Sequence, residues 1–316
     1  MSPPLVTAVI CTRNRAEFLK KCLISLQRQT APAEEYEILV VDNASSDSTV
    51  DAVQNFMGHG NVRYIYEPII GLSRARNTGW KNAAGQYVGY IDDDAVAEDT
   101  WVASAVEVFT TVSPVPDWAG GPIELAWEKA CPDWINEELM VPLGYVNWGK
   151  GARPLTVLER LGGGNSIYPK ETLEAVGGFD ERLGREKNSL LSGEETQLQK
   201  RIEAKGGLLY YYPGIAVRHW VGKERIQAKW FYRRYYWGGV SDYIMDRTLT
   251  EDEKRRNKHS AADNQAQSSL PVRVIRNLFL ATGVTCSAKK TIHSRIYLSY
   301  IVGWLTGTVR WRTKKN

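Results

Sequence analysis

The chain has 316 residues, of which 43% are hydrophobic and 24% are charged, the composition of an ordinary globular protein with one elaborated domain or two small ones. Its net charge of +4 hides an asymmetry, because residues 271–316 hold nine Lys or Arg and no Asp or Glu. Positive charge gathered at one end indicates a local partner and argues against general nucleic-acid binding.

The cysteines and the N-terminus suggest where the protein works. The four cysteines have no C-x-x-C spacing, which argues against a zinc site or a disulfide framework and favours a reducing cytosol. Residues 2–4 lead directly into a predicted strand, so we expect no signal peptide. No apolar run reaches about 18 residues, so we expect no membrane span.

Strands and helices alternate in the first part of the chain. Residues 5–11 and 38–41 are apolar and read as buried strands. Between them Asn14 and Glu17 have the spacing of a capping box, which predicts a helix start at Asn14. A second helix is predicted after residues 45–48, with Val50, Val53 and Phe56 on one side.

The next predicted elements are a third strand over residues 62–66, a helix over 71–84 and a fourth strand from residue 87. The fourth strand ends in Asp92, Asp93 and Asp94. Three carboxylates leaving a buried strand are costly unless a cation or hydrogen-bond donors meet them. Mg²⁺ and Mn²⁺ prefer oxygen ligands, which predicts a divalent metal that holds a phosphate. The alternative is a solvated acidic turn that caps the next helix.

This alternation predicts a parallel, doubly wound α/β sheet, in which ligands bind beyond the carboxyl ends of the strands. Thr12, Asp42 and the three aspartates lie at such ends, so we expect them to converge on one crevice. The sequence has no G-x-G-x-x-G after the first strand and no G-x-x-x-x-G-K-[ST], which argues against a dinucleotide oxidoreductase and a P-loop phosphotransferase. Arg74 and Arg76 could face phosphate or simply form a solvated helix face.

Four segments in this order, CTRNR, VVDNASSD, GLSRARNTG and IDDDA, resemble those of glycosyltransferase family 2, whose members have the GT-A fold. The resemblance covers about residues 5–240. It implies a nucleotide-binding half over 1–112, an acceptor half over 113–240 and a helical, basic C-terminal extension over 241–316. The implied fold is a doubly wound, mainly parallel sheet flanked by helices.

The resemblance also implies a nucleotide-sugar site with a divalent metal, Mn²⁺ or Mg²⁺. The residues expected to bind the nucleotide sugar are Thr12, Arg13, Asn14, Arg15, Asp42, Arg76, Asp92 and Asp93. Among these, Asp42 and Thr12 would contact the base and its ribose. Asp94 would be the main metal ligand, with Asp92 beside it.

The second half of the chain should bind the acceptor. A helix is predicted over residues 98–112 and a strand over 119–125. Trp127 and Trp148 follow in an irregular stretch, where their rings could stack on sugars or build the core. Three glycines before Asn165 let the backbone approach a ligand or form a tight turn. We expect acceptor contacts from Trp127, Trp148, Asn165 and Glu194.

Glu194 and Glu195 begin a predicted helix, where carboxylates can simply complement the helix dipole. The segment resembles the G-E-D segment of the family, whose second acid is the catalytic base, which implies that role for Glu195. The run GREKNSLLSGEE resembles a subset of the family found among bacterial exopolysaccharide and cell-surface polysaccharide enzymes.

His219 lies on a predicted strand, where a lone histidine is more often structural than a ligand. The resemblance implies that His219 helps to hold the metal or the pyrophosphate. Residues 230–237 combine aromatic side chains with two arginines, which predicts core packing and a basic face near the diphosphate or the acceptor.

Residues 246–269 are polar and charged and read as an exposed helix or a linker. Residues 296–309 are apolar and are followed by basic residues. Fourteen residues are too few to span a bilayer but suit an interfacial helix. We therefore expect residues 271–316 to contact anionic membrane from the cytoplasmic side. The alternative is a helix pair packed on the catalytic domain or on another subunit.

Together these features predict an inverting, metal-dependent enzyme that moves a sugar from a nucleotide-diphosphate sugar to a hydroxyl group of a carbohydrate or lipid-linked acceptor. Among the donors, we expect a UDP-sugar. Glu195 would take the acceptor proton during one displacement. One alternative is a sugar-phosphate nucleotidyltransferase. The other is a non-catalytic nucleotide-sugar-binding component of a polysaccharide assembly.

Overall fold

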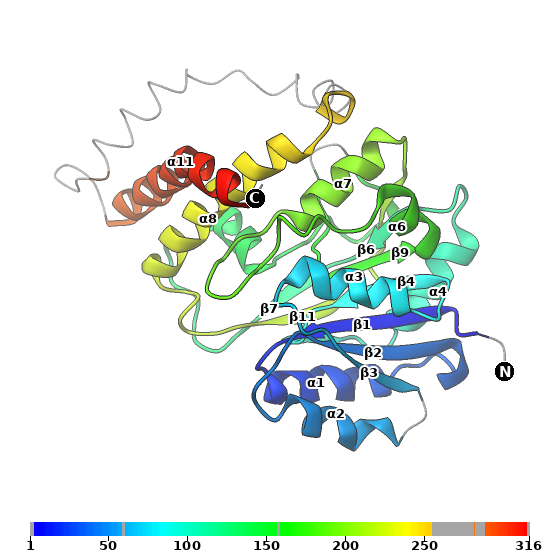
Figure 1. The fold of residues 1–316 in the computed structure, drawn as a ribbon. Coiled ribbons are helices and arrows are strands. Elements are labelled where there is room, and N and C mark those ends of the chain that lie inside the picture. The colour runs from blue at the N-terminus through cyan, green and yellow to red at the C-terminus, as the bar shows by residue number, and fades with distance from the viewer. Residues whose placement is uncertain (1–2, 59–60, 157–158, 255–280, 282–287, 315–316) are drawn as a thin grey trace.

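The computed structural model describes residues 3–58, 61–156, 159–254, 281 and 288–314. Within these residues the strands form an eight-stranded sheet in the order β3-β2-β1-β4-β9-β6-β10-β8 and a three-stranded sheet in the order β5-β11-β7 (Figure 1). The strands of the large sheet are β1 (Val6–Thr12), β2 (Tyr36–Asp42), β3 (Val62–Tyr66), β4 (Tyr87–Ile91), β6 (Trp118–Gly120), β8 (Arg153–Pro154), β9 (Asn165–Pro169) and β10 (Leu209–Tyr211). Those of the small sheet are β5 (Ala95–Ala97), β7 (Ile123–Trp127) and β11 (Val217–Val221).

The predicted doubly wound, mainly parallel sheet is confirmed. β1 pairs in parallel with β2 and β4, and β2 pairs in parallel with β3. β9 runs antiparallel between β4 and β6. β1, β2 and β4 are almost wholly buried, as expected for strands covered on both faces.

Helices cover both faces of the sheet, since right-handed crossovers in opposite directions place helices on opposite faces. In Figure 1, α1 and α2 lie on one side of β1–β3 and α3 lies on the other. The helices are α1 (Ala16–Gln27), α2 (Thr49–Met57), α3 (Leu72–Asn82), α4 (Trp101–Thr111), α5 (Glu137–Met140), α6 (Lys170–Val176), α7 (Glu194–Ala204), α8 (Ala228–Thr248) and α11 (Ala288–Lys314), with short 3₁₀ turns η1 (Ala33–Glu35) and η2 (Val141–Leu143).

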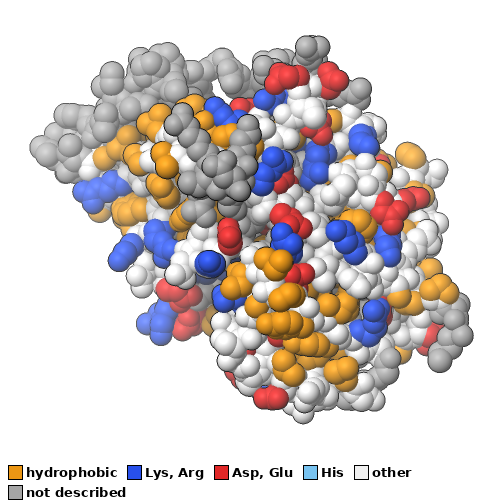
Figure 2. All heavy atoms as spheres, in the orientation of Figure 1, with side chains coloured by type: hydrophobic (Ala, Val, Ile, Leu, Met, Phe, Trp, Pro, Cys, Tyr) orange, Lys and Arg blue, Asp and Glu red, His pale blue; other side chains and the backbone are white. Residues whose placement is uncertain are grey.

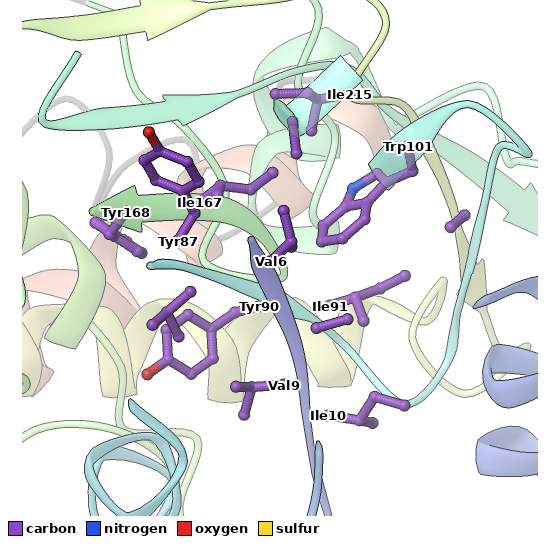
Figure 3. Close-up of a cluster of buried hydrophobic side chains, with 14 of the residues drawn as sticks. Val6, Val9, Ile10, Tyr87, Tyr90, Ile91, Trp101, Ile167, Tyr168 and Ile215 are labelled. Atoms are coloured by element: carbon purple, nitrogen blue, oxygen red, sulfur yellow. The ribbon is translucent and has the colours of Figure 1, made fainter. Parts of the chain in front are cut away.

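The main core lies between β1, β4, β9 and the helices that cover them (Figure 3). Trp101 is fully buried, and its indole Nε1 donates a hydrogen bond to Asn165 Oδ1 at 2.8 Å. A Cβ on Gly89 of β4 would lie 2.5 Å from the Trp101 ring. The glycine therefore makes room for a fully buried tryptophan.

The sequence analysis misread the strands of the acceptor half. Residues 119–125 are not one strand, because β6 ends at Gly120 and β7, which belongs to the other sheet, begins at Ile123. A Cβ on Gly121 would collide with the carbonyl oxygens of Tyr212 and Ile215, so the chain changes sheets at a crowded point. The expected turn before Asn165 leads into β9, and α6 follows it. The sequence analysis predicted neither element. β9 has only five residues and ends in a proline, which is too short a pattern to identify a strand.

Two predictions at helix starts were wrong. Asn14 does not cap α1, because its φ is 56° and its side chain accepts a hydrogen bond from Ser46 N instead. Asp47 Oδ2 accepts from Ala16 N in its place. On α2, Val53 is buried but Val50 is 40% exposed, so the two do not share one inward face.

At the C-terminal end, α8 and α11 pack against each other (Figure 1). α8 runs through residue 240, so no break in secondary structure marks the expected boundary there. The expected linker over 246–269 is described only as far as residue 254, and most of 271–287 also lies outside the described residues. Of the helices in the described ranges, none has both the length and the apolar character needed to cross a membrane.

Candidate functional site

The carboxyl ends of β1 and β4 meet, as the strand alternation predicts. Thr12 ends β1, and its Oγ1 donates a hydrogen bond to Asp93 Oδ2 at 2.7 Å. Arg15, in the loop before α1, places its Nη1 2.8 Å from Asp93 Oδ1 and 2.7 Å from Asp94 Oδ2. Residues more than 75 positions apart therefore build one crevice.

The two inner aspartates have different electrostatic surroundings. Burial and the neighbouring Asp94 raise the pKa of Asp93 to about 6, although Arg15 opposes the shift. Burial would also raise the pKa of Asp94, but His219, Arg15 and Arg225 hold it well below its ordinary value. Asp94 is therefore a carboxylate at any working pH.

Asp92, Asp94 and His219 each offer a ligand atom, and these atoms all lie within 4.8 Å of one another. His219 Nε2 lies 3.1 Å from Asp94 Oδ1, because β11 pairs with β5 in a register that sets His219 opposite Ala95. Two carboxylates and one imidazole are a donor set that suits Mn²⁺ or Mg²⁺. The three side chains predicted as metal ligands thus fit a divalent cation.

At the end of β2, Asp42 has no exposed surface. Its Oδ1 accepts from Ser45 N at 2.9 Å, and its Oδ2 accepts from the Tyr64 hydroxyl at 2.8 Å. Arg13 and Asn14 lie exposed in the loop after β1. The candidate nucleotide residues therefore comprise a fixed carboxylate and an exposed loop.

Arg76 of α3 connects this crevice to the start of α7. Its Nη1 lies 2.7 Å from Glu194 Oε1, and its Nη2 lies 3.8 Å from Asp92 Oδ1. A Cβ on Gly163 would lie 3.0 Å from Arg76 Nη2 and 3.2 Å from Glu195 Cβ, so the glycine loop runs between them. Arg74, in contrast, forms an ion pair with Glu181 at the surface.

Glu194 and Glu195 form a carboxylate pair at the start of α7. Glu194 is buried and Glu195 is half-buried. Burial and the adjacent Glu195 raise the pKa of Glu194 to about 8, against the opposing charge of Arg76. The Oε2 atoms of both side chains are buried and have no hydrogen-bond partner among the described residues. Each side chain therefore keeps one buried oxygen to which a hydroxyl group could donate a hydrogen bond.

Arg225 and Arg234 lie near this pair. The sequence analysis did not mention Arg225, and it included Arg234 only as one of the two arginines in residues 230–237. Arg225 is 9% exposed and places its Nη1 3.9 Å from Asp94 Oδ2. Burial and the charge of Arg185 lower its pKa to about 10. Arg234 of α8 donates to Ser192 Oγ at 2.9 Å, beside Glu194. The aromatic run 230–237 indicated a basic face, but no sequence signal pointed to Arg225.

The candidate acceptor residues have mixed outcomes. Asn165 has no exposed surface and its side chain bonds to Trp101, Pro122 and Ile215, which argues against the predicted contact with an acceptor. Trp148 is half-buried, and its Nε1 donates to Arg160 O. Trp127 ends β7 and packs beside the cluster that contains Phe231. Sugar contact by either tryptophan stays a prediction.

Residues 7–115 match the family model described as Glycosyl transferase family 2. Over these residues the chain is similar to glycosyltransferase family 2. Over 246 residues it is 27% identical to a glucosyl-dolichyl phosphate glucuronosyltransferase of Haloferax volcanii, an alignment that covers 76% of this chain and 77% of that relative.

Solved structures show the same fold as this chain. A mannosyltransferase from Pyrobaculum calidifontis in complex with GDP-Man and Mn²⁺ aligns with a TM-score of 0.62 at 18% identity, covering 98% of this chain and 88% of that one. S. aureus TarS 1-349 in complex with UDP-GlcNAc gives a TM-score of 0.56 at 17% identity, covering 98% and 92%. The expected GT-A fold is therefore confirmed.

Proposed function

We propose that the protein is an inverting, metal-dependent glycosyltransferase that uses a nucleotide-diphosphate sugar. One observation carries the proposal: the ligand atoms of Asp92, Asp94 and His219 gather within 4.8 Å, in the crevice that Arg76 links to the carboxylate pair. The match of residues 7–115 to the glycosyltransferase family 2 model supports sugar transfer. The bound Mn²⁺ and nucleotide sugars of the structural neighbours support this metal and this class of donor.

The donor nucleotide is proposed to lie across the ends of β1 and β2. Asp42 has no exposed surface and accepts from Ser45 N and the Tyr64 hydroxyl, so its proposed role at the base is to hold these two groups in place. Asp92 is 43% exposed at its side chain and so has surface left for a ribose hydroxyl or a metal. Arg13, Asn14, Arg15 and Asp93 are proposed as further contacts to the nucleotide.

Asp92, Asp94 and His219 are proposed to hold the metal. When bound, a divalent cation neutralises charge that develops on the leaving diphosphate. Arg225 and Arg234 support that task, because buried guanidinium groups favour an anionic ligand. Both pKa values lie below the ordinary arginine value through burial and the charge of Arg185.

Glu195 is proposed as the general base. Its Oε2 has no partner in the described part of the chain, whereas Glu194 is committed to Arg76. Glu195 would accept the proton of the acceptor hydroxyl while that oxygen forms a bond to the anomeric carbon and the bond to the diphosphate breaks. One such displacement inverts the anomeric configuration.

The acceptor is proposed to be a carbohydrate or a lipid-linked saccharide used in cell-surface or exopolysaccharide synthesis. The name of the Haloferax relative, which mentions glucosyl-dolichyl phosphate, supports the lipid-linked option. A UDP-sugar is the first donor to test, because TarS was solved with UDP-GlcNAc, and GDP-mannose is the second. The expected cytoplasmic location stays a prediction.

The test is incubation with a panel of nucleotide sugars and Mn²⁺, followed by detection of the products. Release of nucleoside diphosphate together with a glycosylated product supports the proposal, and NMR of that product gives its anomeric configuration. Formation of pyrophosphate or nucleoside triphosphate would favour a nucleotidyltransferase instead. Saturable donor binding without turnover on any acceptor would favour a non-catalytic binding component.

A further inference from the structure

Helix α11 has an apolar surface on two sides. One side packs closely on α8, where a Cβ on Gly303 would collide with the Tyr236 backbone and a Cβ on Gly307 would lie 2.6 Å from Tyr243 Cβ. The Tyr300 hydroxyl donates to Asp242 Oδ2 at 2.7 Å on the same side. This side of α11 is therefore covered by α8.

The side of α11 that faces away from α8 is also apolar. Val302, Leu305 and Val309 are between 51% and 67% exposed. Val302, Leu305 and Val309 follow at spacings of three and four residues, so they form one stripe along the helix. A helix packed on the surface of a soluble domain normally carries polar residues on its outer side. An apolar outer stripe therefore indicates a partner.

The charge of the helix restricts the choice of partner. The sequence of α11 contains six Lys or Arg and no Asp or Glu. The basic residues lie at the two ends, in 289–295 and 310–314, and the apolar stripe lies between them. Figure 2 shows basic and hydrophobic side chains next to each other over the edge of the molecule where α8 and α11 lie.

A second copy of the chain is a poor match for this stripe, because two α11 helices would bring twelve basic residues together without one acid. An anionic lipid surface matches both features: acyl chains accept the apolar stripe and lipid phosphates accept the basic ends. We infer that the stripe of Val302, Leu305 and Val309 is a docking surface for an anionic bilayer, on which α11 lies parallel to the membrane plane.

This surface is tied to the candidate site through α8. The first half of α8 carries Arg234, which bonds to Ser192 two residues before Glu194. The middle of α8 carries Tyr236, Gly239 and Tyr243, which contact α11. If the proposed function holds, a docked α11 keeps the carboxylate pair at a fixed height above the membrane, which suits an acceptor anchored in the same bilayer.

The test is flotation of the full chain with vesicles of phosphatidylcholine mixed with phosphatidylglycerol, compared with vesicles of phosphatidylcholine alone. We expect the wild type to float with the anionic vesicles only and to be released by high salt. Val302→Asp/Leu305→Asp should lower the bound fraction about tenfold or more. Ile24→Asp, at a 47% exposed position of α1, is the matched control and should float like the wild type.

Circular dichroism shows whether each variant is folded, and Val302→Ser/Leu305→Ser, which adds no charge, should also lower binding. Flotation of the aspartate variant at the wild-type level would overturn the inference. So would a wild type that ignores both kinds of vesicle, or one that runs as a dimer that Leu305→Asp dissociates. The assay needs no donor, acceptor or metal, so a chain that floats but transfers no sugar refutes only the proposed function.

Discussion

Arg76 and Glu194 form an ion pair in which Nη1 and Oε1 lie 2.7 Å apart, with 5% and 4% of the two side chains exposed. The pair joins α3 of the nucleotide-binding half to α7 of the acceptor half. Because Arg76 also lies 3.8 Å from Asp92, one guanidinium neutralises carboxylates from both halves. The arrangement keeps the metal ligands and the carboxylate pair in a fixed relation.

At a pH above about 8, where Glu194 is ionised, replacing Arg76 with Met should lower the free energy of unfolding by about 3–5 kcal/mol, because it leaves this carboxylate buried without a countercharge. Urea denaturation measures the change. Arg74→Met is the matched control on the same helix. Its ion pair with Glu181 is more than a third exposed, and such pairs contribute about 0–1 kcal/mol. Equal losses in the two variants would contradict a buried, structural Arg76.

Replacing Asp94 with Asn should abolish sugar transfer at moderate metal concentration. Asp94 is the carboxylate held most firmly in its charged form, and an amide is a much weaker ligand for a hard cation. Turnover as a function of Mn²⁺ concentration, with calorimetry of Mn²⁺ binding, measures the effect. Asp99→Asn, at an exposed aspartate after β5, should behave like the wild type. If the wild type kept full transfer activity in excess EDTA, the proposed metal dependence would be contradicted.

A side chain at position 164 should disturb the candidate metal site and leave the fold intact. A Cβ there would collide with the Asp92 carboxylate. Since that carboxylate is partly exposed, it can move, and the fold should survive. Gly164→Ala should therefore weaken apparent Mn²⁺ affinity about 10–100-fold while leaving the melting temperature nearly unchanged. Gly151→Ala is the control, because nothing lies within 4 Å of its Cβ position. Identical metal titrations for the two variants would argue against Asp92 as a ligand.

The crevice could be predicted from sequence because its parts stand at the ends of strands. Thr12, Asp42 and Asp92–Asp94 follow apolar runs, and parallel strands bring such ends together. The meeting of Asp92, Asp94 and His219 depended on the family resemblance, since a single histidine carries no local signal.

Arg225 and Asn165 show where sequence was insufficient. Arg225 reaches Asp94 only because the small sheet and the loop after β11 fold back over the crevice, and no periodic pattern encodes that placement. Asn165 looked available because three glycines precede it, yet it ends up inside the core, bonded to Trp101. Its role depends on the insertion of β9 between β4 and β6. The sequence pattern of such short strands does not predict this long-range pairing.

The raised pKa of Glu194 predicts how stability depends on pH. The folded protein holds this proton up to a pH of about 8, whereas the unfolded chain releases it near about 4.3. Between these values the unfolded state binds fewer protons, so the free energy of unfolding should fall as the pH rises. Glu194→Gln should flatten this slope in urea denaturation at several pH values.

Glu159→Gln is the control for that slope. Its hydrogen bond with Arg153 holds the pKa of Glu159 at about 2, below its ordinary value. Glu159 therefore contributes stability that is present above its ordinary pKa and is lost as the pH falls toward about 2. The Glu159 variant should keep the wild-type slope at higher pH. If Glu194→Gln also kept it, another group would be responsible.

The last prediction separates the two carboxylates of the pair. Glu195→Gln should leave donor affinity nearly intact and lower the transfer rate by about 10² or more, the usual scale for a general base. Glu194→Gln should reduce the rate less, because Glu194 is committed to Arg76. Calorimetry with the donor and a product-release assay measure the two quantities in both variants.

The reason for this asymmetry is geometric. Both carboxylates keep a buried Oε2 atom without a partner among the described residues, so either could in principle accept a proton. Glu194, however, is held against a guanidinium on its other oxygen, and its raised pKa keeps it protonated below a pH of about 8, so it is not free to take the acceptor proton at neutral pH. Glu195 lies beside the Gly163 backbone, and its amide analogue has the same shape but cannot take a proton. If Glu195→Gln transfers sugar at the wild-type rate, or if Glu194→Gln is the inactive variant, Glu195 is not the base and the roles of the two residues must be exchanged.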